Sequence, residues 1–230
     1  LHLPFTDKNR VGNIYCMQLE GLADVQFQYN FYAGEDIITD PYAGVIYGNE
    51  RWGRQAEPRL RGGMCRHCYD WENDAPLMTP LSDTVLYLIH PRGFTCHSSS
   101  GVQHRGTYAG ITEKLPYLKE LGITAVELMP SYEFLELEKQ ERRERSMDEA
   151  RNHYMDLPEE KDEPPRINYW GYKRGYYFAP KMSYSASDCP AEEFKDMVKN
   201  AHQNGIEVIM QFYFPADVKR AYILEVIKYW

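Results

Sequence analysis

The sequence predicts an α/β fold built on parallel strands, and three consecutive segments carry this prediction. Residues 84–90 are apolar, aromatic and β-branched without polar alternation, which is typical of a strand buried on both faces. In residues 111–121, apolar side chains recur at helical spacing, and Gly122 follows where a helix often ends with a positive φ. Residues 123–130 repeat the first pattern. A strand, a helix and a strand in this order predict a β-α-β unit with a right-handed crossover.

The N-terminal residues 1–52 have an all-β character. Residues 13–22 and 24–34 are short, aromatic-rich runs on either side of a turn at Gly21, which predicts adjacent strands. Residues 53–82 mix glycine, proline and charged residues without any period, and this pattern predicts a linker. We therefore expect a β-rich region, a linker and then the parallel unit from residue 83 onward.

Residues 135–166 are dense in charges of both signs and nearly empty of aliphatic side chains. Opposite charges at helical spacing favour an exposed helix, which the proline-rich end cannot continue. We predict a solvated insertion here. The alternative is an interaction surface, although a charge run needs no function.

The C-terminal part predicts a second helix, a third buried strand and a final helix. Residues 190–205 form the second helix, with Asp188 as candidate N-cap, and residues 206–214 form the strand. Residues 217–230 have helical spacing, with Ile227 on the predicted apolar side. The buried stripe expected for the second helix is Phe194, Met197, Val198 and Ala201.

Composition excludes several classes of protein. The chain has 230 residues, 26% charged and 43% hydrophobic, as expected for a globular protein. A net charge of −8 disfavours nucleic acid as a partner but is compatible with a neutral polymer. Apolar runs fall far short of the roughly 20 residues that span a bilayer, so we expect no membrane association. Five scattered cysteines fit a reducing compartment, and we expect a cytoplasmic protein without a cofactor.

The run CRHC, residues 65–68, is the one hint of a metal site. A zinc site normally has four ligands with a second close pair at a defined spacing, and no such pair follows. We therefore predict free thiols in a loop, with zinc binding as the alternative.

Residues 168–184 are the most aromatic segment of the chain. The spacing of the rings fits neither a helical stripe nor strand alternation, so we predict a compact loop on a scaffold. Ring faces suit sugars, whose C–H faces are apolar while their hydroxyls need hydrogen-bond partners. The alternative is that most of these rings fill the core. The rings belong to Tyr169, Trp170, Tyr172, Tyr176, Tyr177, Phe178 and Tyr184.

Three ordered blocks carry a family resemblance. They read YLIHPRGFT with RGTYAGITEKLPYLKELGITAVELMPSYEF, then NYWGYKRGYYFAPKMSYS, then EFKDMVKNAHQNGIEVIM. These blocks resemble debranching-type members of the alpha-amylase superfamily, such as isoamylase, pullulanase and glycogen debranching enzyme. The resemblance implies a partial TIM (β/α)8 barrel over residues 83–230, holding the first three β/α units, with residues 135–166 as a charged insertion. It also implies that residues 1–52 are the C-terminal part of a β-sandwich glucan-binding-type module.

The resemblance further implies a substrate of the α-glucan class, such as glycogen, starch or pullulan. In the family, the tyrosine of the WGY motif stacks on the sugar next to the scissile bond, and this residue is Tyr172 here. The other substrate-binding candidates are Asn168, Tyr169 and Trp170 in the same block, and Gln211 after the third strand. The parent protein would cut α-1,6 branch points by a retaining mechanism, and this part would pack against the remainder of its own barrel.

No catalytic residue is assigned in this chain. Retaining glycosidases need two carboxylates flanking the bond, and in the family these follow the fourth and fifth barrel strands. The sequence ends at Trp230, after three strand-helix units. We therefore expect a fragment without hydrolase activity of its own.

The sequence also departs from the family after its third strand. Where an active member has Asp-Val-Val-Tyr-Asn-His, this chain reads Gln-Phe-Tyr-Phe-Pro-Ala, residues 211–216. The aspartate that helps order the catalytic carboxylates is replaced by Gln211, and the histidine that contacts the sugar falls at Ala216. An alternative hypothesis is a catalytically inactive homologue that binds α-glucan or regulates glycogen metabolism.

Overall fold

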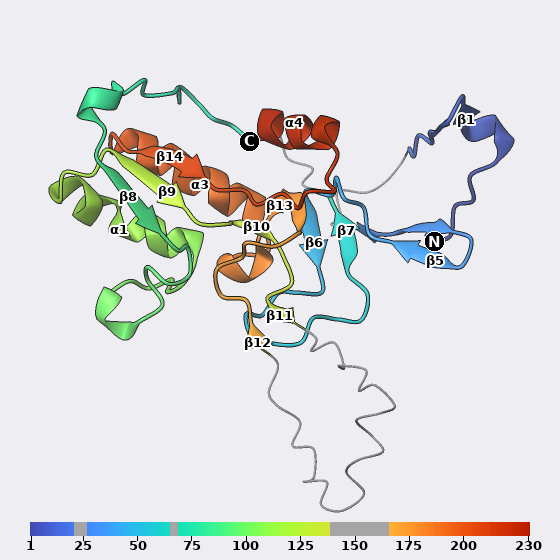
Figure 1. The fold of residues 1–230 in the computed structure, drawn as a ribbon, viewed down its shortest axis with the longest axis horizontal. Coiled ribbons are helices and arrows are strands. Elements are labelled where there is room, and N and C mark those ends of the chain that lie inside the picture. The colour runs from blue at the N-terminus through green and yellow to red at the C-terminus, as the bar shows by residue number, and fades with distance from the viewer. Residues whose placement is uncertain (21–26, 65–68, 139–165) are drawn as a thin grey trace, which may run out of the picture.

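The computed structural model describes the chain in four stretches, residues 1–20, 27–64, 69–138 and 166–230. Its main feature is a parallel sheet with the strand order β14-β9-β8 (Figure 1), which confirms the predicted β-α-β unit. The register places Glu127 of the central strand between Leu88 and Ile209 of its neighbours. The strands are β8 (Leu86–Ile89), β9 (Ala125–Leu128) and β14 (Glu207–Met210).

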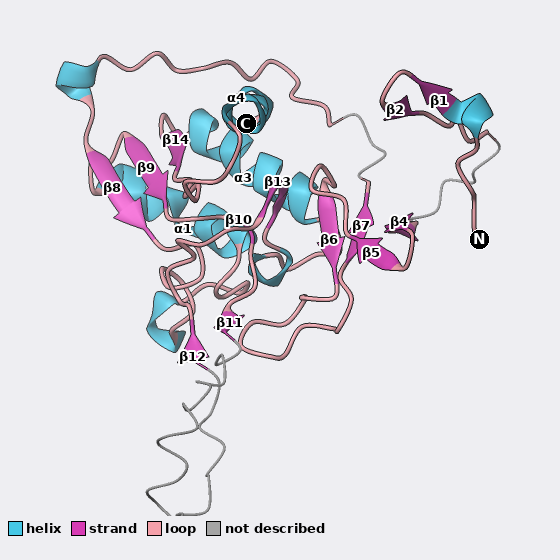
Figure 2. Cartoon of the chain, turned by 45° about the vertical axis from the view of Figure 1, so that its right-hand side comes forward, coloured by secondary structure: helices cyan, strands magenta, loops and turns pink. Residues whose placement is uncertain are grey.

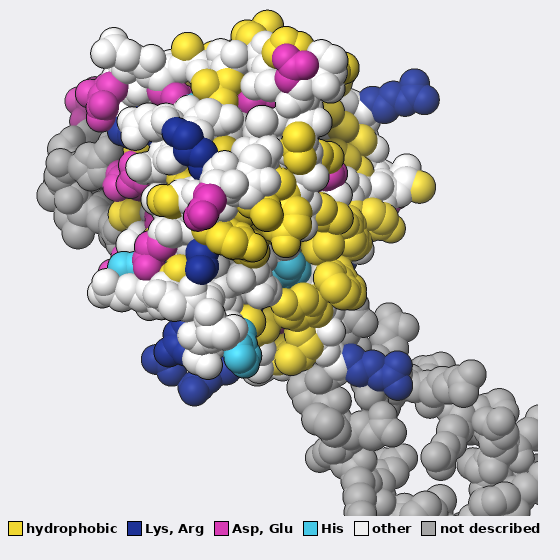
Figure 3. Space-filling view, turned by 90° about the vertical axis from the view of Figure 1, so that its left-hand side faces the viewer, with side chains coloured by type: hydrophobic (Ala, Val, Ile, Leu, Met, Phe, Trp, Pro, Cys, Tyr) yellow, Lys and Arg dark blue, Asp and Glu magenta, His cyan; other side chains and the backbone are white. Residues whose placement is uncertain are grey.

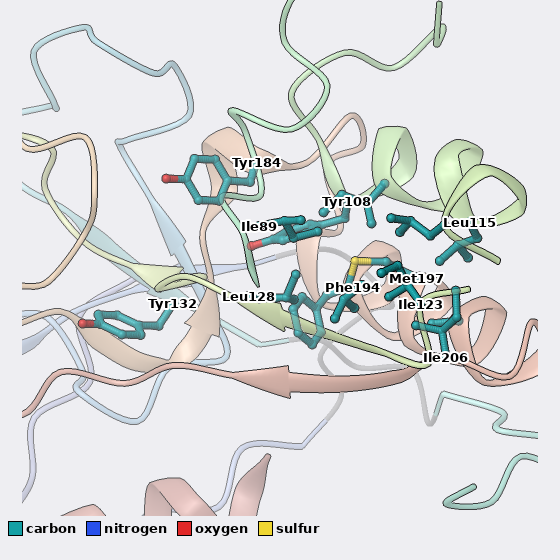
Figure 4. Packing of buried hydrophobic residues seen from close by; sticks show 14 of the residues in the cluster. Ile89, Tyr108, Leu115, Ile123, Leu128, Tyr132, Tyr184, Phe194, Met197 and Ile206 are labelled. Carbon is teal, nitrogen blue, oxygen red and sulfur yellow. The ribbon is translucent and has the colours of Figure 1, made fainter. Parts of the chain in front are cut away.

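Two helices cover one face of this sheet. Helix α1 (Tyr108–Glu120) connects β8 to β9, and α3 (Pro190–Gln203) leads into β14. The first helix ends before Gly122, whose φ of 81° confirms the predicted helix end. The main core lies between the helices and the sheet (Figure 4). It includes Ile89, Tyr108, Leu115, Leu118, Leu128, Phe194, Met197 and Ile206.

The other face of the sheet is open, and this corrects the prediction that residues 84–90 are buried on both faces. The exposed fractions are 48% for Leu86, 38% for Tyr87 and 46% for Leu88, whereas Ile89 is 3% exposed. The reason is that the helices cover one face only, and β8 is an edge strand among the described residues. Hydrophobic side chains gather on the side of the molecule where β8 lies (Figure 3). Within the described part of the chain, the three strands do not close into a barrel.

The N-terminal region is β-rich, but its strands pair differently from the prediction. In the described parts of residues 13–22 and 24–34 the strands do not pair with each other, because each part contributes a strand to a separate local hairpin. Glycines with positive φ at the two turns, Gly12 and Gly34, favour these short-range pairings. The hairpins pair β1 (Arg10–Val11) with β2 (Ile14–Tyr15), and β4 (Phe31–Ala33) with β5 (Asp36–Ile38).

The predicted linker, residues 53–82, contains a strand. This strand, β7 (Arg61–Gly63), is the central one of an antiparallel sheet in the order β3-β7-β6. A Cβ atom on Gly63 would lie 2.5 Å from the ring of Tyr47, so the close approach requires glycine. The β-rich region therefore extends to Gly63, and residues 69–80 then cross the molecule to reach β8 (Figure 2). The flanking strands are β3 (Gln28–Tyr29) and β6 (Val45–Tyr47).

Two short antiparallel pairs follow β9 and frame the charged insertion. The pairs are β10 (Tyr132–Glu133) with β13 (Tyr176–Pro180), and β11 (Leu137–Glu138) with β12 (Arg166–Ile167). Strand β11 ends at Glu138, and β12 begins at Arg166. The exposed helix predicted between them lies outside the described residues. The prediction of a solvated insertion over residues 135–166 is wrong at Glu136, which is 0% exposed.

Glu136 is buried because it belongs to an ion cluster that joins the N-terminal region to the parallel unit. Nζ of Lys181 lies 3.0 Å from Oε1 of Glu133 and 3.0 Å from Oε2 of Glu136, and none of the three side chains is more than 2% exposed. The side-chain amide of Asn49 donates to the same two oxygens, at 2.8 Å and 3.0 Å. The backbone N–H of Gly53 donates to the other oxygen of Glu136 at 3.0 Å. One buried cation therefore holds two buried carboxylates.

Burial and the lysine charge act in opposite directions on the two carboxyls. Burial raises the pKa of Glu133, and the attraction of Lys181 offsets only part of this effect. Burial also acts to raise the pKa of Glu136, but the charge and hydrogen bonds of Lys181 and Asn49 outweigh it and lower that pKa.

The N-terminus of α3 differs from the prediction, because Cys189 and not Asp188 is the N-cap, with Pro190 as first helical residue. The carboxylate of Glu193 in the first turn reaches back to the preceding loop. It accepts hydrogen bonds from the backbone N–H groups of Ala186, at 2.8 Å and 3.0 Å, and of Ser187, at 2.9 Å. A first-turn glutamate thus anchors the loop before the helix.

The final helix, α4 (Arg220–Tyr229), packs against β13 and the N-terminal region. The hydroxyl of Tyr222 donates to the carbonyl of Pro41 at 2.8 Å, and Nε1 of Trp230 donates to the carbonyl of Tyr177 at 2.7 Å. With these contacts Val226 is buried, at 0% exposed. Ile227 was predicted to lie on the apolar side of the helix, but it is 57% exposed. None of the helices in the described stretches has the length and apolar content that crossing a bilayer requires.

Candidate functional site

The prediction of a compact loop over residues 168–184 is wrong for its second half, because residues 176–180 form β13, and Tyr177, Phe178 and Tyr184 are buried in the core. The remaining aromatic loop, residues 168–173, lies at the carboxyl ends of β9 and β14. Gln211 follows directly on β14, and its backbone N–H donates to the carbonyl of Leu128 at the end of β9, at 2.9 Å. The hydroxyl of Tyr172 donates to Oε1 of Gln211 at 2.5 Å, so the loop reaches the strand ends. In barrels of parallel strands, active sites lie at this edge of the sheet.

The backbone of the loop is fixed on both sides of Tyr172. Gly171 has a φ of 78° and donates its N–H to Oδ1 of Asn168 at 3.1 Å. The hydroxyl of the fully buried Tyr132 lies 3.2 Å from the carbonyl of Gly171 and 2.8 Å from that of Lys173. Asn168 therefore has a positioning contact inside the loop, and the ring of Tyr172 projects from a fixed backbone.

Tyr169 is held by a histidine at the end of β8. The rings of Tyr169 and His90 are stacked, with centroids 4.2 Å apart and an interplanar angle of 14°. Nε2 of His90 lies 2.7 Å from the carbonyl of Tyr169, while Nδ1 accepts from the backbone N–H of Gly93 at 2.9 Å. These partners fit the neutral tautomer with the proton on Nε2. Burial lowers the pKa of His90, which favours the same neutral form.

Two rings of the loop remain open to ligands. Trp170 is 54% exposed and stands edge-on to Tyr169, with an interplanar angle of 89°. Tyr172 is 44% exposed. A large apolar face with a polar edge is the kind of surface on which a sugar ring stacks.

Gln211 connects the loop to the centre of the sheet. Its Nε2 donates to Oε1 of Glu127 on β9 at 2.7 Å. Because a carboxylate only accepts hydrogen bonds, the amide nitrogen faces Glu127 and the amide oxygen faces Tyr172. The structure thus brings Tyr172 and Gln211 into contact and places Asn168, Tyr169 and Trp170 in the same loop. Their role in sugar binding stays a prediction.

Sequence analysis missed three residues that shape this site: His90, Glu127 and Tyr132. His90 ends an apolar strand without a recognisable motif around it. Tyr132 is one tyrosine among many. Only Glu127 could have been noticed from the sequence, because it is the single charged residue in the mostly apolar run 123–130.

The CRHC run lies outside the described residues, so the zinc hypothesis rests on its sequence alone. Within the described residues, no group of three or more His, Cys, Asp or Glu side chains is arranged to hold a metal ion. Metal analysis of the purified protein is the direct test.

Parallel strands with an aromatic loop at their carboxyl ends place the chain in the class of α/β proteins whose sites lie at that edge of the sheet. The family model described as the catalytic domain of alpha-amylase matches residues 88–215, more than half of the chain. The chain belongs to the alpha-amylase family.

Several relatives agree with this family. The chain is 36% identical to isoamylase 1, chloroplastic, of Oryza sativa subsp. japonica over 231 residues, covering 90% of this chain and 26% of the relative. It is 41% identical to a glycogen debranching enzyme of Dickeya chrysanthemi over 223 residues, covering 88% of this chain and 30% of the relative. A pullulanase of Paenibacillus barengoltzii, solved with maltotetraose, superposes with a TM-score of 0.59 at 26% identity, covering 89% of this chain and 37% of that one. The chain thus spans 26% and 30% of the length of these two curated relatives.

Proposed function

We propose that this chain is the part of a debranching-type α-glucan hydrolase that supplies glucan-binding surface. The observation that carries the proposal is the loop at the carboxyl ends of β9 and β14. It exposes Trp170 and Tyr172 while Gln211 and the buried Tyr132 fix their surroundings. The names of the relatives, which are isoamylases, debranching enzymes and pullulanases, support an α-glucan as substrate class. The α-1,6 linkage is what the family resemblance implies.

The proposal gives different roles to the two regions of the chain. Residues 83–230 contribute the first three β/α units of a barrel, and the β-rich region before them is the end of a glucan-binding-type module. The retaining mechanism requires two carboxylates, and no acidic residue of this chain is assigned to that role. We therefore expect the 230 residues to bind glucan without cleaving it, in the cytoplasm of the cell that makes them.

The binding part is tested by titrating the chain with maltotetraose and following the heat of binding. We expect Tyr172→Ala to weaken binding by a few-fold to about tenfold, because fully burying an aromatic side chain contributes ~1.5–3 kcal/mol and a sugar would cover only part of a ring that is 44% exposed. Tyr117→Ala is the matched control, since Tyr117 on α1 is 49% exposed and lies outside the site. Unchanged affinity in Tyr172→Ala would remove the main support for the proposal.

A second candidate function is an inactive homologue that binds α-glucan or regulates glycogen metabolism. It is favoured by Gln211, a neutral amide in contact with Tyr172, and by Ala216, which is exposed in the turn that follows. Sequencing the coding DNA past the Trp230 codon separates the two candidates. A later strand ending in Arg-x-Asp and another ending in glutamate would support the hydrolase, and their absence would support the binding protein.

A further inference from the structure

Glu127 occupies an unusual place on the sheet. Its strand neighbours Val126 and Leu128 point into the core beneath the helices, so Glu127 lies on the opposite, open face. In the register it stands between Leu88 and Ile209, two apolar side chains. A partly buried carboxylate between apolar neighbours is costly unless it is hydrogen-bonded, and the hydrogen bond from Gln211 meets this need.

The alternation of side chains along β14 brings Gln211 to that carboxylate. Ile209 is paired with Glu127, and the two side chains lie on the same face of the sheet. Gln211 follows Ile209 by two residues, so its side chain lies on that face as well. The hydrogen bond of 2.7 Å between Nε2 of Gln211 and Oε1 of Glu127 follows from this register. A charged acceptor makes this hydrogen bond stronger than one between neutral groups.

The two hydrogen bonds that link Tyr172, Gln211 and Glu127 each have a defined donor and acceptor. Glu127 can only accept, so it fixes the amide of Gln211 with the nitrogen inward and the oxygen toward Tyr172. The hydroxyl of Tyr172 therefore donates its proton to Gln211. The lone pairs of the phenol oxygen then remain available to accept from a ligand hydroxyl.

We propose that Glu127 is a positioning residue for the glucan site, acting through Gln211 to fix the ring and the proton of Tyr172. The proposal rests on the proposed function, because it assumes that Tyr172 contacts the sugar.

The test combines a sugar-free readout with binding. The chain is labelled with ¹³Cζ-tyrosine, the resonance of Tyr172 is assigned by its loss in Tyr172→Phe, and maltotetraose affinity is measured in parallel. We expect Glu127→Ala to shift the Tyr172 resonance and to weaken binding on the order of three- to tenfold, as for a lost hydrogen bond. Glu127→Gln keeps an acceptor for the amide of Gln211, so it should retain both properties.

A double-mutant cycle shows whether Glu127 acts through Gln211. In the Gln211→Ala background, adding Glu127→Ala should change neither the Tyr172 resonance nor the affinity further. Glu207→Ala is the matched control, because Glu207 lies on the same face at the other end of β14. A near-ultraviolet circular dichroism spectrum like that of the unmodified chain shows that each variant is folded.

The outcomes separate the two proposals. If Glu127→Ala leaves the Tyr172 resonance unchanged, or if Glu127→Gln behaves like Glu127→Ala, the positioning role is wrong. If the resonance shifts as expected but Tyr172→Ala leaves maltotetraose affinity unchanged, Glu127 does position Tyr172 and the proposed function fails instead.

Discussion

Replacing Lys181 with methionine should destabilise this fold more than most single substitutions. The change removes a cation that contacts Glu133, Glu136 and the carbonyl of Phe134 at 3.0, 3.0 and 2.7 Å. Methionine nearly preserves the volume, so the main loss is electrostatic. Two carboxylates that are 1% and 0% exposed are left without a counter-ion. Removing one partner of a buried ion pair costs about 3–5 kcal/mol, a large share of a typical total of about 5–15 kcal/mol.

Urea unfolding followed by circular dichroism measures this loss. With a slope of about 1–3 kcal/mol per molar urea, the midpoint should fall by at least about 1 M. The loss should also depend on pH. Without the lysine, burial and mutual repulsion raise the folded-state pKa values of both carboxyls above the value of about 4.3 expected in the unfolded chain. The free energy of unfolding of Lys181→Met should therefore be highest below that pH, and it should fall as pH rises through the folded-state pKa values of the two carboxyls.

Two further variants decide whether the reasoning about Lys181 is right. Adding Glu133→Gln and Glu136→Gln to Lys181→Met should recover much of the lost stability, because no buried charge remains. Lys199→Met is the control, since its partner Glu72 is 62% exposed and that ion pair is screened by water. A loss in Lys181→Met no larger than in Lys199→Met, or one independent of pH, would refute the argument.

Other predictions concern the loop of the candidate site. Gly171→Ala should destabilise the fold by about 1–3 kcal/mol in urea unfolding, since it adds a Cβ 2.6 Å from the ring of Phe134 to a backbone with a φ of 78°. Gly122→Ala, with a φ of 81° and no atom within 4 Å of the new Cβ, should cost less; equal losses would mean that the contact with Phe134 is unimportant. Because burial lowers the folded-state pKa of His90, the stability it contributes is present above about pH 6.5 and is lost as pH falls below that value. Unfolding free energies of His90→Gln from pH 8 to 5 should show a weaker dependence than those of the unmodified chain, and an identical dependence would contradict the burial argument.

The parallel unit was predictable from sequence because its signals are local. The apolar runs of β8, β9 and β14 and the helix end at Gly122 each occupy a few consecutive residues. The strand β7 was missed for the opposite reason. Its sequence, Arg61-Gly62-Gly63, has no β-branched or aromatic side chain, and its place in the centre of a sheet depends on space that Tyr47 and its neighbours leave only for glycine.

Sequence analysis did not predict the ion cluster, because its members belong to residue types that usually lie at the surface. Lys181 and Glu136 are charged residues, which are mostly exposed, and Glu136 stands at the start of a run of charges. The carboxylates of Glu133 and Glu136 also accept hydrogen bonds from Asn49, which is more than 80 residues away in sequence. The candidate site was partly predictable, because the aromatic segment and Gln211 carry motif information. Glu127 became meaningful only when the register placed it beside Gln211.

The hydrogen bonds from Asn49 and Gly53 to the buried carboxylates bear on how such proteins can be recombined. A chimaera joined at residue 82 would keep Glu133, Glu136 and Lys181 but would lose two of the donors that surround them. The foreign N-terminal part would have to supply equivalent donors at the same places, or the junction would contain unsatisfied buried charge. The segment that can be exchanged between relatives without breaking these hydrogen bonds therefore has to include both the region before residue 82 and the parallel unit after it. The β-rich region and the parallel unit should be grafted or replaced together.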